Sequence, residues 1–114
     1  MAGSILFPNE PHWSAGSQAF WPIVDRIRAA VPNESRRLVE PLFEPAEVFQ
    51  FIELGEDVSA EAFLCFAQVA RSEFERCSRS EEEAQFPIGC YQGIIDRWSE
   101  LVTRLESDCR WTSE

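Results

Sequence analysis

The segment "SAEAFLCFAQVARSEFERC", from Ser59 to Cys77, carries the strongest structural signal in the sequence. Its apolar residues repeat at about 100° per residue, the spacing of one side of an amphipathic α-helix. They are Phe63, Phe66, Ala67, Ala70, Phe74 and Cys77. Ser59 is a favourable N-terminal cap, because its hydroxyl can accept a hydrogen bond from the first helical turn. Leu64, Cys65 and Val69 make the first half apolar on other sides too, so the sequence predicts a buried, central helix.

Helical spacing of apolar residues is also present in three other segments, residues 18–31, 34–43 and 91–109. Asn33 is a suitable cap for the second of these helices, and Pro41 disturbs it near its end. We therefore expect further helices around the central one.

The segment "EPAEVFQFIELGED", residues 44–57, allows two interpretations. Its apolar residues could form a buried strand. However, Pro45 at the start, Glu47 in the first turn and Gly55 just past the end are the usual signals of a helix. We predict a helix over residues 45–54.

Residues 1–16 contain Pro and Gly interruptions around short apolar pieces, which is typical of an extended segment. We expect an arm that lies across the domain, with Phe7 and Trp13 as its anchors.

A chain of 114 residues with no linker or repeat fits one domain. The predicted fold is all-α: a single-domain bundle of roughly four to six helices with an extended N-terminal arm over residues 1–16.

The chain is strongly acidic, with 20 Asp and Glu against 10 basic residues and a formal net charge of −10. Such a field repels phosphate backbones and anionic lipids, so neither a nucleic acid nor a membrane is the expected partner. It attracts a protein partner with a basic surface instead.

The N-terminus lacks the features of a secretory signal, and no stretch is long enough to span a bilayer, so we expect a cytoplasmic protein.

Residues that would support catalysis or metal binding are sparse. The only histidine is His12, and "HWSAGS" lacks the first glycine of a nucleophile elbow. The four cysteines contain no C-x-x-C pair, so we expect reduced, mostly buried thiols; they are Cys65, Cys77, Cys90 and Cys109. No calcium-loop, di-iron or Gly-rich phosphate motif is present. We predict no catalytic residues, no metal and no cofactor, and hence a protein that is not an enzyme.

The stretch "SEEEAQFPIGCYQG", residues 80–93, has two compatible interpretations. Ser80 and Glu83 fit a capping box at a helix start, where carboxylates are favoured by the helix dipole. Alternatively, an acidic row beside apolar residues is the arrangement expected where a basic partner docks. The candidate contact residues here are Glu81, Glu82, Glu83, Phe86 and Ile88, and a second acidic patch comprises Glu53, Glu56 and Asp57.

Two functions fit these features. The first is an inhibitor that neutralises a basic protein, such as a toxin domain, by occluding its active site, as toxin-immunity proteins and antitoxins do. The alternative is a structural or adaptor subunit, in its simplest form a homodimer, with Trp98 and Trp111 as interface anchors. A carboxylate-only enzyme would instead require a deep pocket with two acidic residues of divergent pKa.

Overall fold

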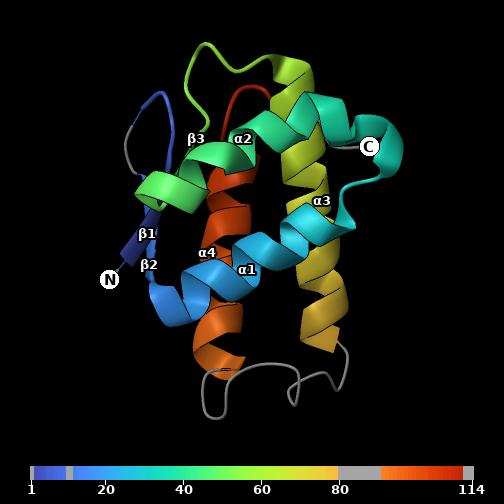
Figure 1. The fold of residues 1–114 in the computed structure, drawn as a ribbon. Helices are drawn as coiled ribbons and strands as arrows, with labels where there is room; N and C mark the ends of the chain where they lie inside the picture. Colours follow the sequence, from blue (N-terminus) through green and yellow to red (C-terminus); the bar gives the residue numbers. More distant parts are fainter. Residues whose placement is uncertain (1, 10–11, 80–90, 112–114) are drawn as a thin grey trace.

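The fold combines four α-helices with a small sheet in a computed structural model that describes residues 2–9, 12–79 and 91–111 (Figure 1). In chain order the elements are β1 (Ala2–Leu6), β2 (Trp13–Gly16), α1 (Ser17–Ala30), the 3₁₀ helix η1 (Asn33–Ser35), α2 (Arg36–Phe49), β3 (Phe51–Glu53), α3 (Ala60–Arg79) and α4 (Tyr91–Glu106). The all-α prediction is therefore wrong in one respect, because a three-stranded sheet accompanies the helices.

The central helix is present as predicted. The Ser59 hydroxyl lies 3.1 Å from the backbone nitrogen of Ala62 and caps α3. Figure 1 shows α3 and α4 side by side in opposite directions, with α1 and α2 crossing them. The fully buried Trp98 of α4 packs against α3: its ring centre lies 6.3 Å from that of Phe74, and its Nε1 donates to the Ala70 carbonyl at 3.1 Å.

One helix, α2, replaces the two helices predicted over residues 34–43 and 45–54. It continues through Pro41 and Pro45, because its buried residues Val39, Phe43 and Ala46 keep helical spacing across both prolines. A continuous apolar stripe against the core offsets the backbone hydrogen bonds that the prolines cannot make.

Helix α2 ends where Gln50 adopts a left-handed backbone conformation, with φ 61° and ψ 36°. Its amide nitrogen still lies 3.1 Å from the Ala46 carbonyl oxygen. Left-handed residues at this position are usually Gly or Asn, so Gln50 gives no sequence signal of a helix end. The chain then enters β3, which means that residues 51–53 form a strand and not the predicted helix.

The predicted extended arm is a pair of strands within the sheet, whose order is β2-β1-β3. β1 pairs antiparallel with β2, from Ala2 opposite Gly16 to Ile5 opposite Trp13, and parallel with β3. Phe7 and Trp13 are buried, as expected of the anchors of the arm. The ring of Phe20 lies so close to Gly3 that a Cβ there would be 2.3 Å from it, so this strand position requires glycine.

Candidate partner-binding surfaces

The residues predicted around the acidic triplet lie outside the part of the chain that the structure describes. They are Glu81, Glu82, Glu83, Phe86 and Ile88. The geometry of a candidate site therefore comes from the second predicted patch and from surfaces that the sequence did not reveal.

Glu53, Glu56 and Asp57, here called the acidic turn, lie at the end of β3 and in the turn that follows it, and all three are exposed. The chain turns through a hydrogen bond of 3.1 Å between the Val58 nitrogen and the Gly55 carbonyl. A Cβ atom on Gly55 would lie 3.3 Å from Oδ1 of Asp57 and 3.6 Å from Oε2 of Glu53. These two carboxylates thus flank the same backbone position, and the turn presents concentrated negative charge to solvent.

Arg110 fixes the backbone around the acidic turn through hydrogen bonds. Its guanidinium donates to the carbonyl oxygens of Leu54 at 2.7 Å, Gly55 at 2.9 Å and Val58 at 3.3 Å. It also bonds both carboxylate oxygens of Asp108, at 2.9 and 3.0 Å. The hydrogen bonds from Arg110 keep the pKa of Asp108 below its ordinary value. These hydrogen bonds fix the backbone of the turn. They do not involve the carboxylates of Glu53, Glu56 and Asp57, which remain exposed to solvent.

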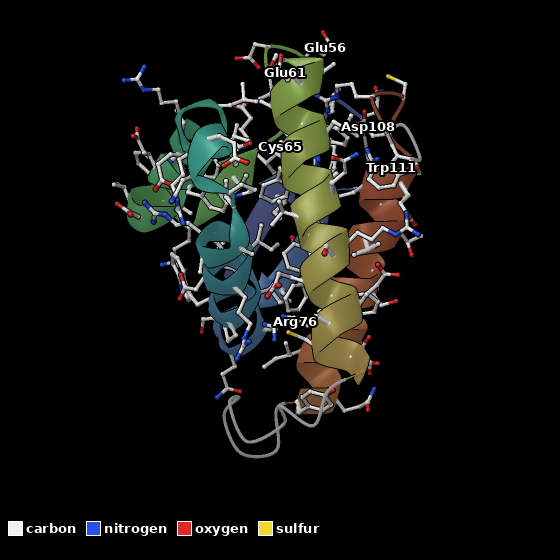
Figure 2. All side chains as sticks on the ribbon, turned by 90° about the vertical axis from the view of Figure 1, so that its right-hand side faces the viewer. Glu56, Glu61, Cys65, Arg76, Asp108 and Trp111 are labelled. Atoms are coloured by element: carbon white, nitrogen blue, oxygen red, sulfur yellow. The ribbon has the colours of Figure 1, made fainter. Side chains whose placement is uncertain are left out.

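An open groove of ≈ 920 Å³ lies between the acidic turn, the β1–β2 loop and the end of α4. Glu56 and Glu100 line it with Arg104, which donates to the Asn9 carbonyl at 2.8 Å and lies over the Phe7 ring. Figure 2 shows Glu56, Glu61 and Asp108 toward one end of the molecule, opposite Arg76. A groove of this kind suits a protruding side chain of a partner better than an enclosed substrate.

Metal-ligating groups are predicted to be absent, and His12 and the cysteines are the other residues considered for chemistry. No group of three or more His, Cys, Asp and Glu side chains in residues 2–9, 12–79 and 91–111 is placed to hold a metal ion. Nδ1 of His12 accepts a hydrogen bond of 3.0 Å from the Phe7 nitrogen, so this imidazole closes the β1–β2 connection. Cys77 is buried, Cys65 is half-buried and Cys109 is exposed, while Cys90 lies outside the described residues, so the expectation of mostly buried thiols holds only in part.

The structure reveals an exposed apolar surface at the end of α2 that the sequence did not predict. Val48 and Phe49 are 72% and 68% exposed, and the ring of Phe49 stacks on that of Phe51 with centroids 5.8 Å apart. We call these three residues the Phe49 patch. The exposure of Val48 could have been predicted from a helical wheel of α2, because Val48 lies about 180° from the buried Val39.

Trp98 and Trp111, the interface anchors predicted for a homodimer, are not both exposed. Trp98 is fully buried at 0% exposure. Trp111 is half-buried, and the Arg71 guanidinium lies 5.7 Å from the centre of its ring. Figure 2 shows Trp111 beside α3. Trp98 therefore serves the core, and the prediction of its role at an interface is wrong.

No helix in the described part of the chain is both long and apolar enough to cross a bilayer.

Comparison with known proteins gives a likeness of fold. A chain in the structure of the CdiA-CT toxin from Burkholderia pseudomallei E479 in complex with its cognate CdiI immunity protein has a TM-score of 0.75 to this chain, at 19% sequence identity. The match covers 95% of this chain and 97% of that chain. No family model and no curated protein matches the sequence. At this identity the likeness establishes a shared fold along nearly the whole chain.

Proposed function

We propose that this chain is an immunity protein: a cytoplasmic, non-enzymatic inhibitor that binds a basic toxin domain and occludes its active site. The observation that carries the proposal is the fold, which matches a chain of a toxin–immunity complex over 95% of this protein. Fold alone does not fix function, so the charge and surface of the molecule must agree with the assignment.

The charge agrees with this assignment. A net charge of −10 on a small domain speeds encounter with a basic protein and disfavours unsuitable partners. The acidic turn supplies negative charge on a backbone that Arg110 fixes in advance, which lowers the entropy cost of binding. We assign partner contacts to Glu53, Glu56 and Asp57, and to the residues of the predicted acidic triplet and its apolar neighbours.

A growth-rescue assay tests the proposal. The protein encoded by the gene next to that of this chain is tested as the toxin: it is induced in a bacterial host, with or without this chain. We expect growth arrest with the toxin alone and recovery with both, together with a stable complex of the two purified proteins. A complex of this type buries roughly 1,200–2,000 Å² in total. Unrelieved growth arrest and no complex would reject the immunity function.

The CdiA-CT toxin of Burkholderia pseudomallei E479 provides the specificity control. At 19% identity to the matched chain of that complex, most surface residues differ. Because specificity depends on matched contacts and on repulsion of wrong partners, we expect no protection against that toxin. Equal protection against both toxins would contradict specific recognition of one partner.

A structural or adaptor subunit is the second candidate function, and the exposed Phe49 patch is the observation that favours it. An apolar patch of this kind can also join two copies of a chain. Sedimentation of the isolated protein over a range of concentrations separates the two functions. A monomer supports the inhibitor, whereas a dimer whose affinity hardly changes with salt supports the adaptor.

A further inference from the structure

We propose that the free edge of β3 is a docking site for an extended, basic segment of the toxin domain, which adds to the sheet as a fourth strand. This inference rests on the proposed immunity function and names the surface through which it acts. Three independent features of the described residues support it: unpaired backbone groups, exposed aromatic rings and an acidic rim.

The backbone of β3 has one bonded edge and one open edge. The Ser4 nitrogen bonds the Gln50 carbonyl at 3.1 Å, and the Leu54 nitrogen bonds the Leu6 carbonyl at 2.7 Å. In a parallel pair, alternate residues turn their N–H and C=O groups toward the same neighbour. Ile52, paired with Ile5, therefore also bonds β1, while Phe51 and Glu53 direct their backbone groups away from it.

β3 is the last strand of the sheet on that side, so no other strand in the described residues meets those backbone groups. Natural proteins usually protect such an edge with Lys, Pro or a bulge, because an open edge pairs readily with another chain. Phe51, Ile52 and Glu53 include no Lys, Pro or bulge, so the protection of this edge is limited to the short length of the strand and the charge of Glu53. The backbone of β3 is thus free to receive a further strand, the arrangement known as β-augmentation.

The Phe49 patch lies next to this edge. Phe51 is in the strand itself, and its ring stacks on Phe49, which is the last residue of α2. Val48 and Phe49 are the large apolar side chains most exposed in the described part of the chain. Aromatic residues at a binding surface supply much of its affinity once water is excluded from them. The edge fixes the direction of an incoming strand, and the patch gives its side chains an apolar contact.

The charge around the patch selects a basic strand. Glu44 precedes Val48 by one helical turn, and Glu53 follows Phe51 on the same face of the strand. Both carboxylates are exposed, and neither pairs with a cation in the described residues. A second copy of this chain is a poor occupant, because it would bring an equal acidic rim and a net charge of −10 against the first.

Two substitutions at one position test the strand pairing. Glu53→Pro removes the outward N–H and places a ring in the path of the incoming strand, while the bonds to β1 stay intact. Glu53→Ala removes the same carboxylate but keeps the N–H. With the cognate toxin domain, we expect the affinity of Glu53→Pro to fall at least tenfold below that of Glu53→Ala. Equal affinities of the two folded variants would overturn strand addition at β3.

Amide hydrogen exchange in the unmodified protein gives a readout that does not depend on how a variant folds. The N–H groups of Phe51 and Glu53 should exchange quickly in the free protein and become protected in the complex with the toxin domain. A complex that forms without protecting them leaves the immunity function intact and rejects this surface. Protection that instead grows with the concentration of the isolated chain would make a second copy the occupant, and no complex at all would reject the immunity function itself.

Discussion

Arg110 and Asp108 form a two-point ion pair, with Nε 2.9 Å from Oδ1 and the second guanidinium nitrogen 3.0 Å from Oδ2. The Asp108 side chain is only 5% exposed, and that of Arg110 is 12% exposed. The same guanidinium lies 4.2 Å from the centre of the Phe63 ring and bonds the carbonyls of Leu54, Gly55 and Val58, which flank the residues of the acidic turn. The shape of a candidate binding surface at one point of the chain thus depends on a residue more than fifty positions away.

Replacing Arg110 by Ala should destabilise the protein by about 2–4 kcal/mol, because it leaves the Asp108 carboxylate without its charged partner and three carbonyls without a donor. Arg110→Lys is the control, since it keeps the charge but loses the planar fork, and we expect a smaller loss. Urea unfolding of the variants measures both effects. A loss below about 0.5 kcal/mol in Arg110→Ala would show that the turn holds its shape without this guanidinium.

The Asp108–Arg110 pair also predicts a dependence of stability on pH. Because the pKa of Asp108 is lower in the folded protein than its ordinary value of 3.8, its contribution is fully present above that pH. The contribution disappears as the pH falls through the folded pKa and the carboxylate takes up a proton. Asp108→Asn should therefore be less stable than the wild type at pH 7, and the difference should shrink below about pH 4. A difference that stays constant down to pH 2.5 in urea unfolding would contradict this linkage.

Phe66→Ala should cost about 3–5 kcal/mol of unfolding free energy, because it opens a cavity at the centre of the core. Phe66 is fully buried on α3, and its ring lies 5.7 Å from that of Phe43 on α2. Val48→Ala is the matched control on an exposed site and should change stability by less than about 0.5 kcal/mol. Thermal and urea unfolding provide the measurement. A loss under about 1 kcal/mol in Phe66→Ala would mean that the surrounding helices refill the space.

The sequence predicted the parts of the fold in which the local pattern agrees with the final packing. The stripe of α3 and its cap at Ser59 are of this kind, and so are the buried anchors Phe7 and Trp13. The β1–β2 pair was not predicted because its strands of five and four residues carry too little periodic signal to identify a strand. Ala2 pairs with Gly16, and the segment between the two strands contains Pro8 and Pro11. Prolines so close together indicate a loop when only the local sequence is considered.

The region from Pro41 to Glu53 could not be predicted, because its usual sequence signals are misleading. Both prolines of α2 lie inside the helix, and Gln50 takes the left-handed conformation that normally identifies Gly or Asn. The change from helical to strand spacing at Gln50 leaves Phe49, the last residue of α2, on the surface. The acidic turn could be predicted because its carboxylates lie close together in the sequence. Its contact with Arg110 could not, because Arg110 is more than fifty residues away in the chain.

The acidic triplet at Glu81, Glu82 and Glu83 gives a test of the contact surface predicted from sequence. Reversing all three to Arg should abolish binding of the cognate toxin domain, because a basic partner would then meet like charge. We expect the circular dichroism of the variant to remain helical, since losing a capping box costs about 0.5–2 kcal/mol. Binding measured by calorimetry decides the outcome. Unchanged affinity of the folded triple variant would remove this stretch from the interface.

The acidic turn should govern the speed of association more than the lifetime of the complex. Glu56→Gln with Asp57→Asn removes two exposed charges from the turn, and Asp25→Asn with Glu34→Gln removes two exposed charges elsewhere. Screening shortens the reach of exposed charges to about 10 Å at 0.1 M salt, so the effect should be largest at low salt. In stopped-flow mixing with the cognate toxin domain, we expect the first variant to associate several-fold more slowly than the second, with little change in dissociation. Equal slowing of both variants would assign the steering to net charge and not to the acidic turn.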